Sequence, residues 1–387
     1  MRITYSSKNQ GIALIIAITV IMIMTLIITE LTYTTRTSSL ISTNFKDDLR
    51  AEEMAKSAFN FAKIFLKLDI EIKSHIDQFI ANTGSLGSIK FDGMDPSAIH
   101  IWDLIPIQFP PPLEAFAGII GVKLEEETKK SREENEFYEV EISNESIKIN
   151  INAIFDETKG DTTRQDATAT ELMLYNMLNS EKFSELFTVS DADKREQIRY
   201  NIRDYIDMDS ISQNPKTGSD ENAVYYNFKP SYRVKNKKLD SFDELHMIAE
   251  VDDKYINALA DYITVYGDNK INIKEVPEEI FIAMFSDSVT NKKEAAAKVL
   301  EIRGERNINE NSFFAEAAKK VSESGAAYKA FLEPLVAKQK DYLTTVSTKF
   351  KVIARGHSHD TTKTITAVVD RGRSMTDPIT LLYWRIE

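Results

Sequence analysis

The N-terminal part of the chain is dominated by one long apolar run behind a short polar leader. Residues 9–29 carry no charged side chain, and the leader before them holds two positive charges, Arg2 and Lys8. At a rise of 1.5 Å per residue the run is about 30 Å long, which matches the hydrocarbon layer of a bilayer. The pattern predicts a membrane-spanning helix over about 12–29, with the leader in the cytoplasm and the large remainder outside it.

A cleaved secretory signal is the main alternative for this segment. The apolar part of such a signal is usually about 7–15 residues long and ends in small residues. The run in this chain is longer, and the stretch TLIITELTY at 25–33 offers no pair of small residues at cleavage spacing. The pattern therefore favours a retained anchor.

The apolar pattern then changes from continuous to striped. Apolar residues between Arg50 and Leu68 recur at spacings of three and four, which places them on one helix face, and no Pro or Gly occurs between Gly11 and Gly84. A single helix over 12–68 is predicted. The alternative is an anchor, a spacer and a separate first helix, because the serines and threonines of TYTTRTSSLIST at 32–43 are mediocre helix formers.

Alternating patterns predict strands on both sides of a helical block. FYEVEI (137–142) and IKININ (147–152) are typical of a β-hairpin, and the runs at 346–354, 362–371 and 378–386 are typical of a three-strand meander. Residues between 155 and 340 carry helical spacing. The predicted organisation is a leader at 1–11, a helix at 12–68, an α/β domain formed by 69–154 and 341–387, and an inserted helical domain at 155–340.

The helical block contains a weak internal repeat. ININAIFDE (149–157) resembles INIKEVPEEIF (271–281), and each copy precedes a short amphipathic helix. Pro277 fits the first turn of the second of these helices, because a helix start needs no backbone donor at that position. Two copies indicate a duplicated helical module.

Composition excludes several classes of function. The net charge of −12, from 60 acidic and 48 basic side chains, disfavours binding to nucleic acid. The chain has no cysteine, so disulfides, thiolate zinc sites and cysteine nucleophiles are excluded. No phosphate-binding, dinucleotide-binding, zinc-protease or serine-hydrolase motif occurs, and we therefore expect that the protein is not an enzyme.

The sharpest candidate for chemistry is an acidic segment in the middle of the chain. Within 203–226 it places five carboxylates near one helix end and one turn. Hard cations such as calcium bind six to eight oxygen ligands, which an irregular acidic loop can supply, although the spacing is not that of an EF-hand. A solvated surface loop is the alternative. The candidate calcium ligands are Asp204, Asp207, Asp209, Asp220 and Glu221.

A second candidate is the stretch HSHD at 357–360. Its two histidines, His357 and His359, could bind a transition metal, but they lie in a predicted hairpin loop without a distant third ligand. We interpret them as polar surface residues.

Several separated segments together resemble one family. IRDYIDMDS (202–210) with TGSDENAVYY (217–226), SFDELHMIAEVDDKYINAL (241–259), INIKEVPEEIFIAMF (271–285) and the final LLYWR (381–385) occur in the order of the motifs of type II secretion system protein K. That family is also called general secretion pathway protein K, a large minor pseudopilin. KNQG followed by IALIIAITVI is similar to its prepilin leader. Tyr205 stands where the family usually has tryptophan, and the disulfide of some relatives is missing.

The resemblance implies both a fold and a location. It implies an α+β, pilin-like fold, in which a long N-terminal helix packs on a small antiparallel sheet and a large helical domain is inserted into the sheet region. It implies cleavage by the prepilin peptidase between Gly11 and Ile12, with methylation of the new N terminus. The protein would be anchored once in the inner membrane, with its large C-terminal domain in the periplasm.

The resemblance also implies partners and a cofactor. The expected partners are the minor pseudopilins I, J and H at the tip of the pseudopilus, with the secretin or secreted substrates as further candidates. Calcium bound by the acidic loops is the expected cofactor. The rival interpretations are a minor pilin of a type IV pilus-like system and a membrane-anchored, calcium-binding periplasmic protein.

One departure from pilin-like proteins in general is informative. Most pilin-like subunits have glutamate as the fifth mature residue, where it attracts the terminal amine of a neighbouring subunit, and in this chain that residue is Ile16. A charge at this depth costs roughly 2.5–3.5 kcal/mol on insertion scales. A subunit with nothing ahead of it does not need the carboxylate, so Ile16 predicts the topmost position in the pseudopilus.

Overall fold

The computed structural model describes residues 8–83, 85–86, 89–90, 99–109, 135–154, 167–187, 192–216, 218–302, 312–321 and 330–387. Its contacts divide the chain into two compact units. Unit 1 consists of Met1–Ala58, Gln108–Glu139 and Arg355–Thr364, and unit 2 of Phe59–Ile107, Val140–Ala354 and Ile365–Glu387. The charge run EEETKKSREENE at 125–136, which its sequence predicts to be a surface loop or a short exposed helix, lies outside the described residues except for Asn135 and Glu136.

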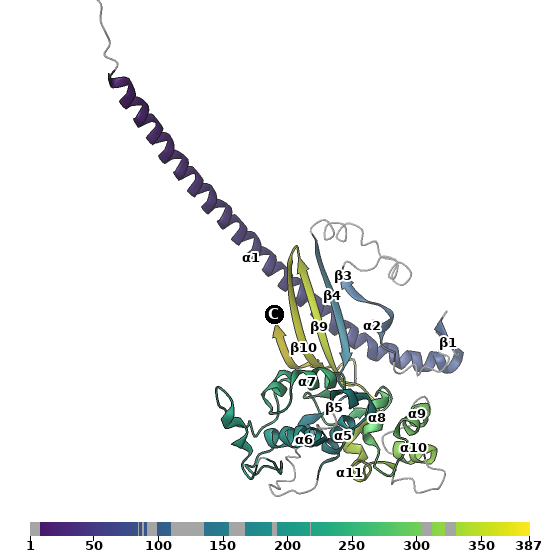
Figure 1. Ribbon diagram of the computed structural model, residues 1–387. Coiled ribbons are helices and arrows are strands. Elements are labelled where there is room, and N and C mark those ends of the chain that lie inside the picture. Colours follow the sequence, from purple (N-terminus) through teal and green to yellow (C-terminus); the bar gives the residue numbers. More distant parts are fainter. Residues whose placement is uncertain are drawn as a thin grey trace, which may run out of the picture. The chain divides into compact units, whose positions relative to one another are not determined.

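The longest element is α1 (Lys8–Thr83), one uninterrupted helix of 76 residues (Figure 1). It contains the predicted helix but continues past Leu68, because nothing in the sequence breaks it before Gly84. The stretch rich in serine and threonine does not interrupt it either. The hydroxyls of Thr32, Thr34 and Thr43 donate to carbonyls four residues earlier at 2.7, 2.9 and 3.0 Å, which satisfies them within the helix.

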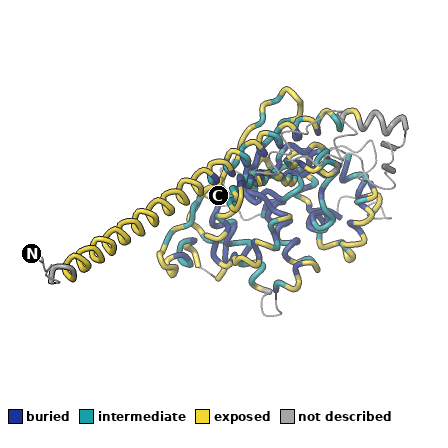
Figure 2. The backbone as a smooth tube through the Cα atoms, turned by 90° about the horizontal axis from the view of Figure 1, so that it is seen from above, coloured by how far each residue is buried: buried dark blue, intermediate teal, exposed yellow. Residues whose placement is uncertain are grey.

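The first part of α1 is long and apolar enough to cross a membrane. The segment Gly11–Lys73 includes an 18-residue window with a mean hydropathy of 3.0, and none of that window is buried inside the chain. Figure 2 shows this part of the helix as a continuous exposed tube. The finding fits a single-pass membrane anchor.

The predicted C-terminal meander is confirmed as part of a five-stranded sheet. The strand order is β11-β10-β9-β4-β3, and β9, β10 and β4 lie side by side in Figure 1. β4 is antiparallel to β9, since Glu145 N donates to Lys349 O and His359 N to Asn135 O. The bounds are β3 (Ile107–Phe109), β4 (Glu136–Asn144), β9 (Lys349–Ser358), β10 (Thr361–Asp370) and β11 (Thr380–Ile386).

In unit 1 the last part of β9 packs directly on α1. A Cβ atom at Gly356 would lie 2.2 Å from Ala51 O and 2.2 Å from Ala55 N, so only glycine permits this approach of strand and helix. Ion pairs flank the contact, with Lys363 Nζ 2.9 Å from Asp48 Oδ1. Small residues on both elements thus set the distance between them.

In unit 2 the remainder of α1 packs on the sheet and on the loop after β10. Ala62 and Leu66 are fully buried, and the rings of Phe59 and Trp384 meet edge to face at 4.9 Å. Lys67 Nζ donates to the carbonyls of Arg371, Ser374 and Asp377 at 2.6, 2.9 and 2.6 Å. This lysine fixes the connection between β10 and β11 on the helix.

The predicted hairpin of 137–142 with 147–152 is wrong. The first run forms β4, but the second leaves the sheet, and β5 (Ile149–Asn150) pairs in parallel with β6 (Ile263–Thr264). The Ser146 hydroxyl accepts hydrogen bonds from Thr348 N at 3.0 Å and Lys349 N at 2.9 Å. The chain therefore turns out of the sheet at Ser146 instead of folding back along β4.

The segment between β4 and β9 forms the inserted helical block, and the internal repeat is visible in its backbone. β7 (Ile271–Asn272) pairs in parallel with β8 (Leu343–Thr344) just as β5 pairs with β6. Asn150 Oδ1 accepts from Asn152 N at 3.1 Å, and Asn272 Oδ1 accepts from Lys274 N at 3.0 Å. The same turn therefore opens the first helical module, defined as 147–268, and the second, defined as 269–345.

The two modules share one apolar core. Their main helices, α5 and α8, pack against each other, and Pro277 is the N-cap of α8. The predicted helices of the block are all present, although the stretch at 242–247 is a 3-10 helix. The bounds are α5 (Ala169–Leu178), α6 (Ala192–Ile206), α7 (Asp253–Leu259), α8 (Glu278–Met284), α9 (Lys292–Ile302), α10 (Phe313–Val321), α11 (Glu333–Ala337) and α12 (Gln339–Tyr342).

Three short elements lie between α1 and β3 in the described residues. β1 (Ser85–Leu86) and β2 (Ile89–Lys90) pair antiparallel with each other, and α2 (Ile101–Leu104) is a single turn. Asp103 closes this turn by accepting from the backbone N of His100 at 2.9 Å.

We expect that Gly356→Ala lowers the free energy of unfolding by roughly 1–3 kcal/mol, the usual cost of forcing extra volume into a packed contact. The added methyl group would overlap the backbone of α1 at Ala51 and Ala55, and backbone cannot rotate out of the way. Denaturant titration of the full chain in detergent would measure the change. An unfolding midpoint equal to that of the parent would contradict the packing described for unit 1.

Candidate functional site

The candidate site is built where α6 ends. One face of α6 buries Ile198 and Ile202 in the helical core, and Asp204 in the last turn of the helix is also buried, at 4% exposure. Asp207 directly follows the helix, and its backbone N donates to Arg203 O at 2.9 Å. Two of the predicted carboxylates are thus held at the helix end by apolar packing of their own helix.

A loop brings a third carboxylate to the same place. Ile211 and Asp220 form an antiparallel bridge, so the chain returns towards α6 at η6, the 3-10 helix Glu221–Ala223. Asp220 Oδ1 accepts from Asn222 N at 2.9 Å and caps this turn. Glu221, the first residue of η6, is therefore directed inwards and is only 2% exposed.

Asp204, Asp207 and Glu221 form what we call the acidic cluster. Each offers a carboxylate oxygen that lies within 4.8 Å of the other two. Their exposed fractions are 4, 3 and 2%. Three carboxylates removed from water at this separation repel one another unless protons or a cation neutralise them.

The hydrogen bonding within the cluster is uneven. Asp204 is satisfied, because Ser212 Oγ donates to its Oδ2 at 2.7 Å and Gln213 N to its Oδ1 at 3.0 Å. Among the described residues, both carboxylate oxygens of Glu221 and Oδ1 of Asp207 are buried without a donor. Arg203 Nε lies 3.9 Å from Asp207 Oδ2, which is a long contact. The acidic cluster is therefore short of positive charge and of donors.

Because the acidic cluster lacks positive charge and hydrogen-bond donors, the pKa values of its carboxyl groups are raised. Burial raises the pKa of Glu221 far above its ordinary value of 4.5, and the charge of Asp207 raises it further. Burial and the charge of Asp209 likewise raise the pKa of Asp207 above 3.8, and burial raises that of Asp204. Without a cation, Asp207 and Glu221 can approach each other only when one of them holds a proton.

The donor set fits a hard divalent cation. Three buried carboxylates, of which two have unpaired oxygens, provide the anionic oxygen ligands that calcium prefers. Asp204, Asp207 and Glu221 are the residues that would hold it. Such an ion would offset the repulsion that otherwise requires a proton on the cluster.

The other two predicted ligands, Asp209 and Asp220, lie outside the acidic cluster. Asp209 Oδ1 accepts from Ile211 N at 2.7 Å, and Asp220 caps η6, so both carboxylates shape the loop that carries Glu221. Sequence reasoning missed Ser212 and Gln213, which hold Asp204. The sequence indicates these two residues only by their position between the two acidic motifs.

The predicted cleavage residues lie on the exposed part of α1. Gly11 is helical, and nothing lies within 4 Å of the position that a Cβ atom would take there. Ile12 and Ile16 are 60% and 58% exposed. Residues 1–7 of the predicted leader lie outside the described residues.

The two histidines of HSHD do not converge on a common point. In unit 1 the ring of His357 stacks on Phe137 at 4.1 Å and its Nδ1 lies 2.9 Å from Thr362 Oγ1. His359 Nδ1 lies instead 3.2 Å from Asp47 Oδ1. The two histidines thus have separate partners. His359 is exposed, whereas His357 lies in β9 and its Nε2 is buried without a hydrogen-bond partner among the described residues.

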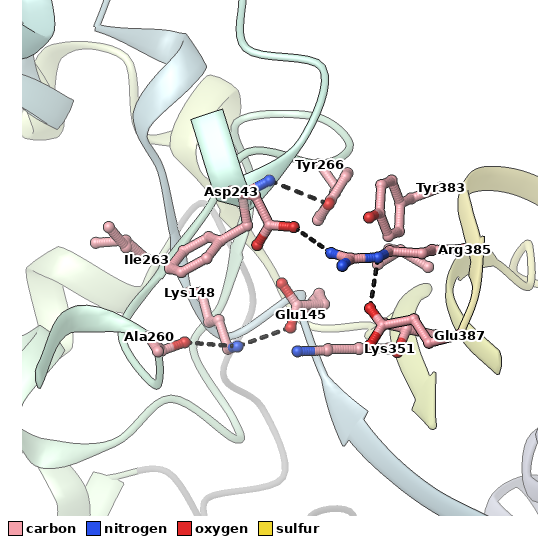
Figure 3. A pocket seen from close by; sticks show the side chains of 13 residues that line it. Glu145, Lys148, Asp243, Ala260, Ile263, Tyr266, Lys351, Tyr383, Arg385 and Glu387 are labelled. Carbon is pink, nitrogen blue, oxygen red and sulfur yellow. Dashed lines mark hydrogen bonds and ion pairs between the residues drawn. The ribbon is translucent and has the colours of Figure 1, made fainter. Parts of the chain in front are cut away.

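A pocket of about 210 Å³ lies between the first helical module and the sheet in unit 2 (Figure 3). Its charged side chains largely neutralise one another. Lys148 Nζ lies 2.7 Å from Glu145 Oε1, and Arg385 lies 2.6 Å from Asp243 and 2.5 Å from Glu387. The pocket is therefore an ion-paired seam, in which the Arg385–Asp243 pair joins the first helical module to β11.

We expect Glu221→Gln to stabilise the protein in the presence of a chelator, by roughly 1–3 kcal/mol at pH 8. The amide removes a buried charge that the fold does not neutralise. A carboxylate whose pKa is raised by folding destabilises the protein at high pH, and the penalty disappears as protonation proceeds on acidification. The extra stability of the Glu221→Gln variant over the parent should therefore decrease towards pH 5. Thermal denaturation of the full chain would measure it. Glu301→Gln, at an exposed position, is the control; a destabilised Glu221→Gln variant at pH 8 would contradict the description of the cluster.

The family of the chain is indicated by the helical block. The model of the family "Type II secretion system (T2SS), protein K" matches residues 147–268. This range is the first helical module and includes the acidic cluster. No curated protein matches the chain.

A solved structure shares the fold. It is a chain in the crystal structure of the GspK-GspI-GspJ complex from the type 2 secretion system of enterotoxigenic Escherichia coli. The alignment covers 91% of this chain and 99% of that chain, with a TM-score of 0.56 and 14% identity. At this identity the likeness shows the fold, and it confirms the predicted α+β, pilin-like arrangement of long helix, antiparallel sheet and inserted helices. Residues 147–268 therefore match the type II secretion system protein K family, within a fold that the chain shares with the GspK-GspI-GspJ structure.

Proposed function

We propose that this chain is a non-enzymatic minor pseudopilin at the tip of a type II secretion pseudopilus, where it initiates assembly and contributes to protein export across the outer membrane. The observation that carries the proposal is the match of residues 147–268 to the protein K family inside a fold that is shared over 91% of the chain. A minor pilin of a type IV pilus-like system would account for α1 and the sheet but not for this module.

The proposed partners are the minor pseudopilins I and J. The structurally similar chain comes from a complex of GspK, GspI and GspJ, and the exposed apolar part of α1 offers the surface along which helices of such subunits could pack. Pseudopilin H and the prepilin peptidase are further proposed partners, on the basis of the sequence resemblance. The secretin and secreted substrates remain candidates.

The proposed location is the inner membrane, with one span and the large C-terminal part in the periplasm. The run at 9–29 carries no charge, and Arg2 and Lys8 precede it, which favours a cytoplasmic leader. Ile16 supports the tip position. Because the expected fifth mature residue is isoleucine, the subunit would carry no carboxylate at that depth in the bilayer. A subunit at the top of the pseudopilus has no subunit above it and does not need this carboxylate for docking.

A second function, calcium binding, is proposed for the acidic cluster. The specific observation is that Glu221 is buried with both oxygens unpaired, beside Asp207 and Asp204. A bound calcium ion would supply the missing positive charge. Asp204 and Asp207 at the end of α6 and Glu221 at the start of η6 would then be tied together, which would stabilise the loop between them.

Cleavage of the leader is the first prediction of the proposed function. We expect the mature protein to begin at Ile12 in cells that contain the prepilin peptidase, with a methylated terminal amine, and at Met1 in cells that lack it. Intact-mass analysis and N-terminal sequencing of the membrane-extracted chain would distinguish the two. A chain that begins at Met1 in both strains would contradict the assignment as a pseudopilin.

Calcium should raise the melting temperature of the full chain in detergent. A ligand at one hundred times its dissociation constant stabilises the folded state by about 2.7 kcal/mol, which corresponds to several degrees for a domain of this size. Asp207→Asn should lose most of this gain, whereas Asp193→Asn, an exposed change on the same helix, should keep it. Equal melting temperatures of the parent chain in chelator and in millimolar calcium would overturn the calcium proposal but leave the pseudopilin proposal standing.

A further inference from the structure

A second group of buried charges lies where four segments of unit 2 meet. His100 precedes α2 and is 7% exposed. Its Nδ1 lies 3.0 Å from Oδ2 of Asp69 on α1, and its Nε2 lies 3.2 Å from Oε2 of Glu275, which follows β7 in the second helical module. The fourth segment is the end of β10, where Arg371 Nη1 lies 2.6 Å from Asp69 Oδ2. We call this group the His100 junction.

The charges that face His100 come from every element around it. On α1, Lys73 Nζ lies 3.1 Å from Glu275 Oε1 and 3.9 Å from Asp69 Oδ2. Asp103, on the element of His100 itself, accepts from its backbone N. With His100 protonated, the three cations His100, Lys73 and Arg371 balance the three carboxylates Asp69, Glu275 and Asp103.

The neighbouring neutral groups leave the imidazole little freedom. The ring of Trp102 stacks on it at 4.3 Å, and that of Phe350 on β9 meets it edge to face at 5.6 Å. Asn144 Nδ2 donates to Glu275, and Ser347 Oγ donates to the same carboxylate oxygen at 3.0 Å. The ring is therefore held in a position that keeps each of its nitrogens against a carboxylate.

This geometry requires two protons on the imidazole. Each ring nitrogen faces a carboxylate oxygen, and an ionised carboxylate can only accept a hydrogen bond. A neutral imidazole carries one N–H and one lone pair, so loss of a proton would set a lone pair against a buried carboxylate at about 3 Å. The contact between the deprotonated ring nitrogen and its carboxylate then becomes repulsive.

The ionisation of the partners supports this argument. Burial alone raises the pKa of Asp69 and of Glu275, but the hydrogen bonds from His100 and the charge of Lys73 outweigh it and bring both pKa values to about 2. Burial lowers the pKa of His100, whereas the hydrogen bonds to Asp69 and Glu275 raise it, and the net result is a pKa above 6.5. Both carboxylates therefore stay charged above about pH 5, whereas the pKa of His100 lies above its ordinary value.

We propose that His100 is a proton-dependent clamp, which in its doubly protonated form holds the second helical module and α2 on α1 and the sheet, and which loosens this junction when it loses a proton. A group whose pKa is raised by folding contributes its full stabilisation below its unfolded value, near 6.5 for histidine. The contribution is lost as the pH rises through the folded value. The proposed clamp is independent of the calcium proposal, because none of its residues belongs to the acidic cluster.

The test compares the full chain in detergent with His100→Gln at about pH 6 and about pH 9. Glutamine keeps one donor for a carboxylate but does not titrate. The expected result is that the parent melts several degrees above the variant at the lower pH and that this difference largely disappears at the higher pH. Titration of other groups cancels in the difference. His75→Gln, an exposed histidine on α1, should follow the parent at both values.

Two local measurements keep the proposal falsifiable if His100→Gln does not fold. Hydrogen exchange of the parent, expressed as protection factors, should show lower protection at about pH 9 than at about pH 6 in β7 and at Ile101, whose amide donates to Asp69. Nuclear magnetic resonance of histidine-labelled parent should show His100 titrating above 6.5, the unperturbed value. Titration of His100 at or below that value, or unchanged protection of β7, would overturn the clamp.

Discussion

The hydrogen bonds around Ser146 are the interaction on which the arrangement of unit 2 depends. They join the segment in which the chain leaves the sheet for the helical block to the segment in which it returns to the sheet. The Ser146 hydroxyl accepts from two backbone amides of the returning strand, and its carbonyl accepts from Asn272 N at 2.8 Å. Residues about two hundred positions apart are thus adjacent, so the block can be inserted between β4 and β9 without disturbing their pairing. The same serine links the sheet to the second module, whose Glu275 reaches the His100 junction.

Most single elements could be predicted from sequence, because their signals are local. The uninterrupted helix, the C-terminal strands and the helices of the block follow from spacing and from the positions of Gly and Pro. The pairing of IKININ could not be predicted, because its alternating pattern suits any strand and its partner, Ile263, lies more than one hundred residues away. The C-terminal extent of α1 was underestimated, because the apolar stripe used to place its end stops near Leu68, whereas the helix continues to Thr83, with no Pro or Gly before Gly84.

The candidate site could be predicted only in part. The acidic motifs identified five carboxylates, but the burial of three of them depends on the apolar packing of α6 and on the turn that returns Glu221. The sequence carries no comparable signal for the His100 junction, because Asp69, His100 and Glu275 come from three segments that are far apart. Both sites follow one physical rule: charges taken out of water need a partner, a proton or an ion. In the acidic cluster Glu221 has no hydrogen-bond partner among the described residues, whereas in the junction the partner is a protonated imidazole.

We propose that this chain, whose residues 147–268 match the protein K family and whose expected fifth mature residue is Ile16, occupies the end of the pseudopilus. The most direct test of this proposal is electron microscopy of isolated pseudopili with gold-labelled antibody against the helical block, together with an antibody against the major subunit as a marker of the shaft. We expect label from this chain at one end of each filament and nowhere along its length. Label repeated along the shaft would contradict it.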